Sequence, residues 1–409
     1  MNLVIIGAQW GDEGKGKIVD FLACDAGVVV RFSGGPNAGH PLLHDDHTYN
    51  LHLVPSGVLY PDTTVVLGTG MVIDPEALFA ELDTLSEQGL QWEGRVMISD
   101  RAHLVLPAYR SEDVQRDKER RFPIGTTGRG IGIAYSLKSA RDGLRLADIL
   151  DDEVYSQVEP EAREFFDQYR ERLAGIACDI TELMHLNRHE HVLLEGAQGA
   201  LLDLDLGTYP YVSSGYSAAA GAALGAGVGP RSIDRILGVF KAYSTRVGNG
   251  PFPTELDSER DAAAERMVRE LGREYGVTTG RKRRIGYLDL VALRYVCRAN
   301  SIDGLVLTHI DVYDEFDEIK VCVAYDYPHE STVQFPASRT ALERAKPVTR
   351  TFKGWKTSLA DARSFEELPS EAKAYIEFIE GFVETPVDML SVGYERERTI
   401  VRRDPWNAS

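Results

Sequence analysis

The stretch Gln9-Trp10-Gly11-Asp12-Glu13-Gly14-Lys15-Gly16-Lys17 separates the apolar run Leu3–Ile6 from the amphipathic run Ile18–Leu22. This order predicts a strand, a glycine-rich loop and a helix. Glycines let backbone N–H groups turn toward a phosphate, and the N-terminus of a helix favours an anion. The loop also holds two carboxylates, although carboxylates repel phosphate. It therefore predicts a metal ligand, a base, or both, beside a phosphate site.

The loop departs from the Walker A pattern G-x-x-x-x-G-K-[ST] at two positions. Gln9 takes the place of the first glycine, and Gly16 takes the place of the hydroxyl residue. That hydroxyl normally holds Mg²⁺, and Asp12 could take over the task because Mg²⁺ prefers oxygen ligands. The alternative is an ordinary strand-to-helix turn with exposed charge.

Composition limits the class of protein. The 409 residues carry a net charge of −18, and 43% of them are hydrophobic, so the chain can bury a large core as one or two α/β domains. The acidic balance argues against a broad surface for nucleic acid or for an anionic membrane. No run is long and apolar enough to span a membrane, and the N-terminus lacks a signal-peptide pattern. We expect a cytoplasmic protein with neither nucleic acid nor membrane as a partner.

The cysteines show no metal-ligand spacing, and each has apolar neighbours in the sequence. They are Cys24, Cys178, Cys297 and Cys322. Such surroundings predict buried free thiols, which a reducing compartment preserves.

Apolar runs and helical periodicity alternate along the chain. Strands are expected at Val28–Phe32, Thr64–Leu67, Val192–Glu195, within Ile233–Val247 and at Leu305–Thr308, and helices at Pro75–Leu85, 163–187, Tyr287–Ala299 and within Phe365–Val383. The small residues of 217–229 predict tight packing against a loop or a ligand rather than a linker.

This alternation predicts an α/β fold with a large, mainly parallel central sheet and helices on both faces. Glycine loops follow several strands, which gives a P-loop-like nucleotide-binding architecture with appended helical and loop regions, because ligands of such sheets bind at the carboxyl ends of strands. No low-complexity linker divides the chain. We therefore expect a single domain over residues 1–409, with a helical subdomain at about 100–190.

A basic run, Arg281-Lys282-Arg283-Arg284, is conspicuous in so acidic a chain. Glycines flank it, and backbone N–H groups near glycine can build an anion site. The alternative is a solvated run of charge, which is the usual fate of such runs.

Several motifs in combination resemble the adenylosuccinate synthetase family. They are QWGDEGKGKIVD (9–20), GTTGRGIG (125–132), EGAQG (195–199), GTYPYV (207–212), STRVGNGPFPTE (244–255) and TTGRKRR (278–284), with a second glycine loop at Asn37–His40. The resemblance runs from Val4 to about Pro405 and is weaker between residues 145 and 190. It implies a C–N bond-forming ligase that joins IMP to L-aspartate with GTP and Mg²⁺, in purine biosynthesis.

The resemblance implies two steps. A base takes the N1 proton of IMP, and O6 attacks the γ-phosphate of GTP to give a 6-phosphoryl intermediate. The aspartate amine then displaces phosphate at C6. Asp12 matches the base and a Mg²⁺ ligand, the Gly39 carbonyl matches a second ligand, and His40 matches the residue that stabilises charge on O6. Lys15 and Lys17 would offset charge on the transferring phosphate, and Gln198 would help to position the nucleotide.

The same resemblance implies the binding residues. For IMP they are Asp12, Asn37, Thr127, Arg141, Gln198, Ser213 and Arg281, where Arg141 reaches the site of the other subunit of a homodimer. For aspartate they are Thr279, Arg281 and Arg283, since arginines grip carboxylates bidentately. For GTP they are Gly11, Glu13, Gly14, Lys15, Gly16, Lys17, Gly39, His40, Arg283, His309, Asp311, Ser391 and Gly393, with Asp311 reading the guanine N1–H and amino group.

The chain departs from the family pattern mainly around the nucleotide pockets. Pro36 stands for His, Pro41 for Thr, Ser213 for Thr, Gly215-Tyr216-Ser217 for Ser-Asn-Thr, Lys282 for Arg, His309 for Lys and Tyr394 for Pro. These changes leave open a paralogue that uses a modified or deoxy purine nucleotide, with ATP as an alternative donor. A catalytically silent nucleotide-binding regulator and a P-loop kinase or GTPase are further alternatives. Retention of Asp12, His40 and Gln198 argues against the regulator, and Gly16 argues against the kinase or GTPase.

Overall fold

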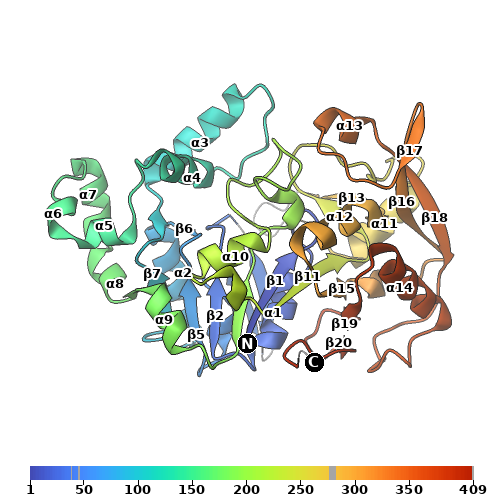
Figure 1. Ribbon diagram of the computed structural model, residues 1–409, viewed down its shortest axis with the longest axis horizontal. Coiled ribbons are helices and arrows are strands. Elements are labelled where there is room, and N and C mark those ends of the chain that lie inside the picture. The colour runs from blue at the N-terminus through green and yellow to red at the C-terminus, as the bar shows by residue number, and fades with distance from the viewer. Residues whose placement is uncertain (38, 45–46, 276–281, 408–409) are drawn as a thin grey trace.

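A computed structural model of the protein describes residues 1–37, 39–44, 47–275 and 282–407 (Figure 1). The centre of the described chain is a sheet whose strands follow the order β20-β19-β15-β11-β1-β10-β2-β5-β7-β9. Their bounds are β1 Asn2–Gly7, β2 Val28–Arg31, β5 Thr64–Leu67, β7 Val96–Ser99, β9 Ala177–Cys178, β10 Val192–Glu195, β11 Arg235–Lys241, β15 Gly304–Thr308, β19 Val387–Ser391 and β20 Thr399–Val401. Every neighbouring pair is parallel except β19 and β20, which are antiparallel.

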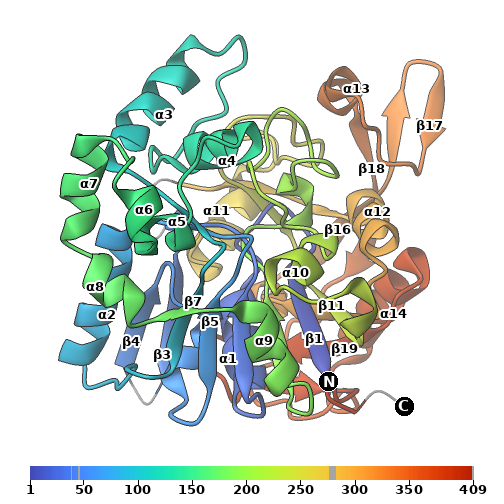
Figure 2. The same cartoon turned by 60° about the vertical axis from the view of Figure 1, so that its left-hand side comes forward.

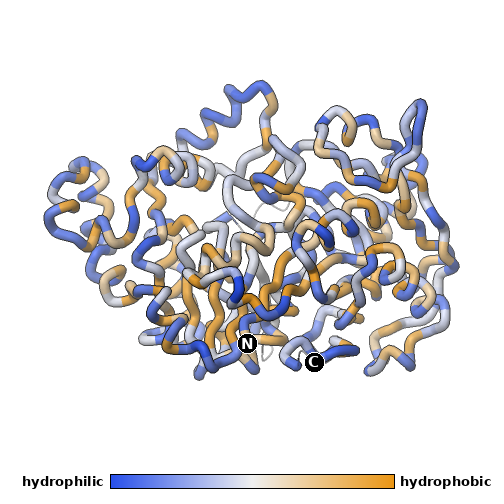
Figure 3. The backbone as a smooth tube through the Cα atoms, in the orientation of Figure 1, coloured by the Kyte–Doolittle hydropathy of each residue, from blue (hydrophilic) through white to orange (hydrophobic). Residues whose placement is uncertain are grey.

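Both faces of this sheet are buried, as its sequence of near-continuous apolar runs requires. Alternate residues of one strand enter different cores: Val4 and Ile6 pack in one hydrophobic cluster, and Leu3 and Ile5 pack in another. Side chains of a strand alternate between faces, so the two clusters are the two layers beside the sheet. Figure 3 shows the same arrangement as hydrophobic strands inside a more hydrophilic exterior.

Helices cover both faces. Side chains of α9 (Ile180–Leu186), α10 (Ala220–Gly225), α12 (Leu290–Asn300) and α14 (Ser370–Val383) pack in the first cluster. Side chains of α1 (Lys15–Ala23), α2 (Pro75–Glu87), α5 (Leu146–Leu150), α7 (Pro160–Asp167) and α8 (Arg170–Ala174) pack in the second. The predicted α/β class, with a mainly parallel sheet between helical layers, is confirmed.

Further elements surround this core (Figures 1 and 2). Helices α3 (Pro107–Glu119), α4 (Ile131–Ala140) and α6 (Asp152–Tyr155) lie on the side of α5, α7 and α8, whereas α13 (Arg339–Arg344) lies by a small, separate sheet. The remaining strands are β3 His40–His44, β4 His47–Leu51, β6 Val72–Ile73, β8 His103–Leu104, β12 Ser244–Arg246, β13 Arg284–Gly286, β14 Leu288–Asp289, β16 Glu318–Tyr327, β17 Glu330–Thr332 and β18 Lys346–Lys353. The other helices are α11 (Ala262–Leu271) and the short η1 Ser56–Leu59, η2 Ala200–Leu202, η3 Pro230–Ser232 and η4 Ile310–Tyr313.

Local sequence patterns locate most core elements well. The strands at 28–31, 64–67, 192–195 and 304–308 and the helix from Pro75 are where they are expected. The small-residue stretch does pack tightly, because a Cβ at Gly225 would overlap the Phe32 carbonyl oxygen. The subdivision into one domain with a helical subdomain at about 100–190 stays a prediction.

Other expectations are wrong or only partly right. The single helix expected over 163–187 is three short helices with β9 between them, because β9 pairs with β7 and interrupts the helical run. The helix expected from Tyr287 is present but starts only at Leu290, after β14. The strand expected within Ile233–Val247 is confirmed as β11, and β12 follows it. Cys297 and Cys322 are buried free thiols, but Cys24 is exposed and Cys178 is half-buried, because α1 ends beside Cys24 and β9 lies at the sheet edge.

Among the described residues, no helix combines the length and apolar character needed to cross a membrane.

Candidate functional site

The carboxyl edge of the parallel strands brings together loops that are far apart in the sequence. The loops after β1, β2, β10, β15 and β19 all leave the sheet at this edge, because these strands run in the same direction. They contain the segments 8–14, 32–37, 196–199, 309–311 and 391–393. Most sequence-predicted site residues therefore gather at one edge, as expected for an open parallel sheet.

The Glu13 side chain turns back into the glycine loop and binds the loop's own backbone. Its carboxylate is fully buried and accepts hydrogen bonds from the N–H groups of Gln9 and Gly11, at 3.1 and 2.8 Å. It also forms a 2.5 Å ion pair with Lys15. Gly7 leaves room for this arrangement, since a Cβ there would overlap the carboxylate. A phosphate that reached Lys15 would therefore have to compete with Glu13.

Asp12 points the other way from its neighbour. Its residue has φ of 59°, in the left-handed region, and its side chain is 39% exposed. Its Oδ2 lies 2.8 Å from Nε of Arg283, an ion pair without the alignment of a hydrogen bond. The predicted base thus faces the open side of the loop and touches a predicted aspartate-binding residue.

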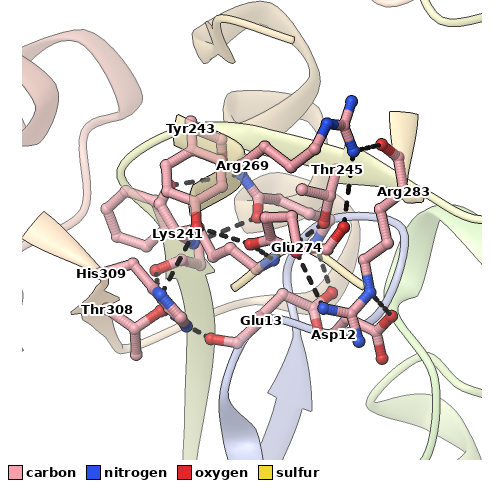
Figure 4. Close-up of polar contacts among 12 residues, drawn as sticks. Asp12, Glu13, Lys241, Tyr243, Thr245, Arg269, Glu274, Arg283, Thr308 and His309 are labelled. Carbon is pink, nitrogen blue, oxygen red and sulfur yellow. Dashed lines mark hydrogen bonds and ion pairs between the residues drawn. The ribbon is translucent and has the colours of Figure 1, made fainter. Parts of the chain in front are cut away.

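Arg283 connects Asp12 to a buried carboxylate that sequence reasoning missed. Its Nη1 donates to Oε2 of Glu274 at 2.8 Å, and the Glu274 side chain is fully buried (Figure 4). The other oxygen of Glu274 accepts from Lys241 at 2.6 Å and from the Tyr243 hydroxyl at 2.5 Å. Burial opposes ionisation of Glu274, but the cations of Lys241 and Arg283 outweigh it and lower its pKa to about 2.

His309 borders both this cluster and the glycine loop. It has φ of 55° and directly follows β15, and its Nδ1 lies 3.5 Å from the Tyr243 hydroxyl. A Cβ built on Gly14 would lie 3.5 Å from its Nε2. Burial and the nearby cation of Lys241 lower the pKa of His309 to about 3, so the imidazole is neutral at pH 7. Where the family pattern has a cation, this chain presents an uncharged ring.

The predicted guanine pocket lies at the ends of β15 and β19. Asp311 is in η4, directly after β15, and Ser391 ends β19. Lys17 reaches this pocket: its Nζ donates to Oγ of Ser391 at 2.7 Å and to the carbonyl of Gly393 at 2.8 Å. Burial lowers the pKa of Lys17 to about 8, although the carboxylate of Asp311 opposes the shift. Lys17 is thus bonded at the end of β19, near Asp311, and its expected role beside the transferring phosphate stays a prediction.

Two other predicted residues meet beside the loop. The amide Nε2 of Gln198 donates to Oδ1 of Asn37 at 3.3 Å, and Gln198 has φ of 58°. A Cβ on Gly11 would lie 3.9 Å from the Gln198 backbone. The loops after β1, β2 and β10 thus form one continuous surface.

The loop that contains Thr127 is shaped by two aspartates of α3 that the sequence analysis did not single out. Asp117 accepts from the N–H groups of Ile124, Gly125 and Thr126, at 2.9 to 3.0 Å. Asp113 accepts from the Thr126 hydroxyl at 2.9 Å and from Gly130 N–H at 3.1 Å. Thr127 is left exposed.

Ser213 belongs to a turn that lies against the start of α4. Its N–H donates to the Leu202 carbonyl at 2.7 Å, and Oγ of Ser214 would lie 3.4 Å from a Cβ on Gly132. The turn that carries Ser213 is thus near the Thr127 loop.

Arg141 is at the far end of α4 from Thr127. It follows the last residue of the helix, has φ of 72° and is exposed. Ten helical residues span about 15 Å, so the two residues lie at opposite ends of a rod of that length.

Some predictions fall where the structure says little or nothing. Thr279 and Arg281 lie outside the described residues. His40 begins β3, and its side-chain role stays a prediction. Gly39, expected to offer a carbonyl to the metal, directly precedes that strand.

The described cations of the basic run 281–284 differ in their partners. Arg283 pairs with Asp12 and Glu274, and Arg284 pairs with Glu255 through Nε and Nη2, at 2.7 and 2.5 Å. Lys282 is exposed. Both described arginines of the run therefore have carboxylate partners in the same chain, and an anion site built by the run stays a prediction.

Tyr394, expected beside the base pocket, is half-exposed, and the guanidinium of Arg273 lies 5.4 Å from the centre of its ring. Tyr216 is also exposed.

The fold and this edge define a class of protein: an α/β enzyme with a modified phosphate-binding loop whose carboxylate lies against an arginine. The family model for adenylosuccinate synthetase matches residues 4–164 and 156–400. Adenylosuccinate synthetase of Acaryochloris marina is 45% identical over 99% of this chain and 95% of that protein. That of Clostridium novyi is 46% identical over 97% of this chain and 98% of its own length. The chain belongs to the adenylosuccinate synthetase family.

Solved structures agree with this assignment. The fully ligated adenylosuccinate synthetase of Plasmodium falciparum matches with a TM-score of 0.92 and 37% identity, over 98% of this chain and 99% of that one. The succinoaminodeoxyadenylate synthetase of cyanophage S-2L, bound to dGMP and dATP, matches with a TM-score of 0.65 and 20% identity. The second likeness concerns the fold alone.

Proposed function

We propose that this protein ligates L-aspartate to IMP, with GTP as the phosphate donor, and gives adenylosuccinate, GDP and phosphate. The observation that carries the proposal is the pairing of Asp12 with Arg283 at the mouth of the glycine loop, in a chain about 45% identical to adenylosuccinate synthetases over its whole length. A proton acceptor and a carboxylate-binding cation then lie side by side, which the joining of a purine to a dicarboxylate requires.

Asp12 is the base. Its oxygen accepts the N1 proton of IMP, electron density moves to O6, and O6 attacks the γ-phosphorus of GTP as the bond to GDP breaks. The aspartate amine then attacks C6, and the 6-phosphoryl group leaves as phosphate. A well-placed base of this kind typically contributes about 10²–10⁴ in rate. Exposure of the Asp12 carboxylate supports this role, since a base must reach its substrate.

Arg283 binds the aspartate substrate. Its guanidinium is held on one side by Glu274 and on the other by Asp12, and it is only 11% exposed. A guanidinium fixed in this way keeps its remaining nitrogen, Nη2, oriented to donate a charge-assisted hydrogen bond to a substrate carboxylate. Thr279 and Arg281 complete the aspartate site, and Asn37, Thr127, Gln198 and Ser213 the IMP site, in this proposal.

Mg²⁺ fits the donors that the chain provides. Among the described residues, no group of three or more His, Cys, Asp or Glu side chains is arranged to hold a metal. Mg²⁺ commonly uses one or two protein oxygens and completes its octahedron with water and phosphate. The Asp12 carboxylate and the Gly39 carbonyl would hold it, and the ion would neutralise charge on the transferring phosphoryl group.

Asp311 selects the donor base. Its carboxylate accepts two hydrogen bonds from guanine N1–H and N2–H₂, and adenine offers no such pair. Lys17, Ser391 and Gly393 already form a bonded network at this pocket, so the pocket is shaped before the nucleotide arrives. His309 replaces a cation here, and we expect looser discrimination against ATP than in relatives with lysine.

The active unit is a homodimer in this proposal. Arg141 lies at the opposite end of α4 from Thr127 and is exposed, so it is available to the site of a partner subunit rather than to its own. Arg141→Leu mixed with Asp12→Ala should regain activity after subunit exchange, because one hybrid site has both residues intact. Each variant alone is the control, and no recovery would place Arg141 in its own subunit or outside the site.

One experiment tests the proposal as a whole. Purified protein with Mg²⁺ is incubated with aspartate and either IMP or dGMP, and with either GTP or ATP, and products are identified by mass. We expect adenylosuccinate from IMP and GTP. Product from dGMP instead would establish the paralogue activity, and no product from any combination, with nucleotide still bound, would establish the silent regulator.

A further inference from the structure

Glu274 has every feature of a side chain held in one orientation. It is fully buried, and both of its oxygens are used: Oε1 accepts from Lys241 and Tyr243, and Oε2 accepts from Arg283 (Figure 4). Two donors on one oxygen and one on the other fix the plane of the carboxylate. Charge-assisted hydrogen bonds of this kind are shorter and stronger than neutral ones.

Lys241 and Tyr243, the two donors to Oε1 of Glu274, form a clamp that belongs to the central sheet and its adjoining turn. Lys241 is the last residue of β11, which pairs with β1 in the centre of the sheet. The Gln9 side chain fastens this strand end to the glycine loop: its Oε1 accepts from Lys241 N–H at 3.1 Å, and its Nε2 donates to the Tyr243 carbonyl at 2.9 Å. Lys241 also donates to Thr245 at 2.9 Å. The clamp is therefore anchored to the same strands that position Asp12.

Arg283 receives its orientation from this clamp. Nη1 is committed to Glu274 and Nε lies against Asp12, so among the described residues Nη2 is the guanidinium nitrogen to which no partner is assigned. Without Glu274, only the ion pair with Asp12 would orient the Arg283 guanidinium. A planar cation placed between two carboxylates at fixed angles has its third nitrogen at a fixed place.

We propose that Glu274, fixed by Lys241 and Tyr243, is a positioning residue that aligns Arg283 for the α- or β-carboxylate of the aspartate substrate. The inference rests on the proposed function, and it concerns how the aspartate site is assembled rather than which reaction occurs. Glu274 does not touch the substrate. It acts through Arg283, so its loss should affect the use of aspartate and spare the use of IMP and GTP.

Glu274→Gln tests the inference, with steady-state kinetics in each of the three substrates. We expect KM for aspartate to rise about tenfold or more, while KM for IMP and for GTP change less than about threefold. The matched control is Glu255→Gln, which removes the carboxylate from the neighbouring Arg284 pair and should leave all three KM values unchanged. Equal rises in all three for Glu274→Gln would mean a merely structural role and overturn the inference.

The Arg283→Leu background separates positioning from direct binding. If Glu274 acts through Arg283, adding Glu274→Gln to Arg283→Leu should change KM for aspartate by less than about twofold, because the effects of residues that act as one unit are not additive. A further tenfold rise in the double variant would show that Glu274 acts independently of Arg283. Tyr243→Phe, which removes one donor and no charge, should raise KM for aspartate by a smaller factor than Glu274→Gln.

A further variant controls for loss of stability, since Glu274→Gln leaves the buried cation of Lys241 without its carboxylate partner. Lys241→Met with Glu274→Gln removes both charges, and replacing a buried pair as a whole is often tolerated. A folded double variant, checked by its thermal unfolding, should keep the raised KM for aspartate, and a normal KM would overturn the inference. Wild-type protein that makes no adenylosuccinate would instead refute the proposed function, so the two failures are distinct.

Discussion

Two carboxylates of the site, the fully buried Glu274 and the half-buried Asp311, differ in what surrounds them. Glu274 accepts hydrogen bonds from Lys241, Tyr243 and Arg283. Burial opposes its ionisation, but the cations of Lys241 and Arg283 outweigh it and lower its pKa to about 2. Asp311 is largely desolvated and forms no side-chain ion pair with any described residue, so burial raises its pKa to about 6. The cation of Lys17 opposes this rise without cancelling it.

This difference indicates different roles: Glu274 binds side chains of the protein itself, whereas Asp311 is available to bind a ligand. All lone pairs of Glu274 that point into the cluster are used, so it can orient a neighbour but cannot recognise a substrate. The cost of desolvating Asp311 is only partly offset by Lys17, as expected if its hydrogen-bond donors arrive with the nucleotide in the proposed function. Asp12 is a third case, since it is exposed enough to accept a proton and paired enough to stay oriented.

The largest expected effect comes from this third carboxylate. Asp12→Ala should lower kcat by about 10²–10⁴ or more, because the variant loses proton acceptance and a metal ligand together. The fold should survive, since Arg283 keeps Glu274 as its partner. Single-turnover kinetics with a thermal unfolding control measure this. Turnover within tenfold of the parent would show that Asp12 is not the base, and none of the three compared carboxylates would then take part in the chemical step.

The next effect concerns donor choice. Asp311→Asn should lower kcat/KM for GTP by about 10² or more and leave ATP nearly unaffected, because a buried mismatch of donors and acceptors discriminates strongly. Glu315→Gln, an exposed carboxylate four residues along, is the control. If the wild-type protein prefers ATP, or if Asp311→Asn keeps the preference for GTP, Asp311 is not the group that reads the base.

Acid should weaken GTP binding before it affects the rest of the site. Asp311 has a pKa of about 6, so it becomes protonated as the pH falls below that value and can no longer accept both guanine donors. We expect KM for GTP to rise by up to about tenfold per pH unit below pH 6. KM for aspartate should stay flat in this range, because Glu274 remains ionised to about pH 2. The same series with Asp311→Asn should show no such rise.

The smallest effects should appear in stability, with opposite signs for the two carboxylates. The folded pKa of Glu274 is below its ordinary value of 4.5, so its contribution is present above about pH 4.5 and is lost as the pH falls toward 2. The folded pKa of Asp311 is above its ordinary value of 3.8, so its contribution is present below pH 3.8 and is lost as the pH rises through 6. Urea unfolding from pH 2 to pH 7 measures both.

In these curves, Asp311→Asn should gain stability relative to the parent near pH 7, where the parent buries a charge. Lys241→Met with Glu274→Gln should flatten the acid side between about pH 4.5 and pH 2. If the free energy of unfolding depends on pH in the same way for the parent and both variants, Glu274 and Asp311 do not have the shifted pKa values described.

The sequence by itself determined the scaffold and the identity of several candidate site residues. The apolar run Leu3–Ile6 followed by glycines and an amphipathic run is a local signal, so β1, the loop and α1 were predictable. The separate apolar runs of β2, β5, β10 and β15 were equally local. The motif resemblance supplied Asp12, Arg283 and Asp311, and the direction of the parallel strands explains why the loops of Asp12 and Asp311 share an edge.

Tertiary structure alone decided which charges are neutralised inside the protein. Glu13 looks like a nucleotide ligand in the loop sequence, but its carboxylate turns inward because Gly7 leaves space for it. Lys17 looks like a phosphate ligand, but it is bonded to Ser391 and Gly393, more than 370 residues along the chain. The pairing of Lys241 with Glu274 joins residues 33 apart that carry no local periodicity. Such pairs arise where strand ends and turns converge, and that convergence depends on sheet order rather than on any one segment.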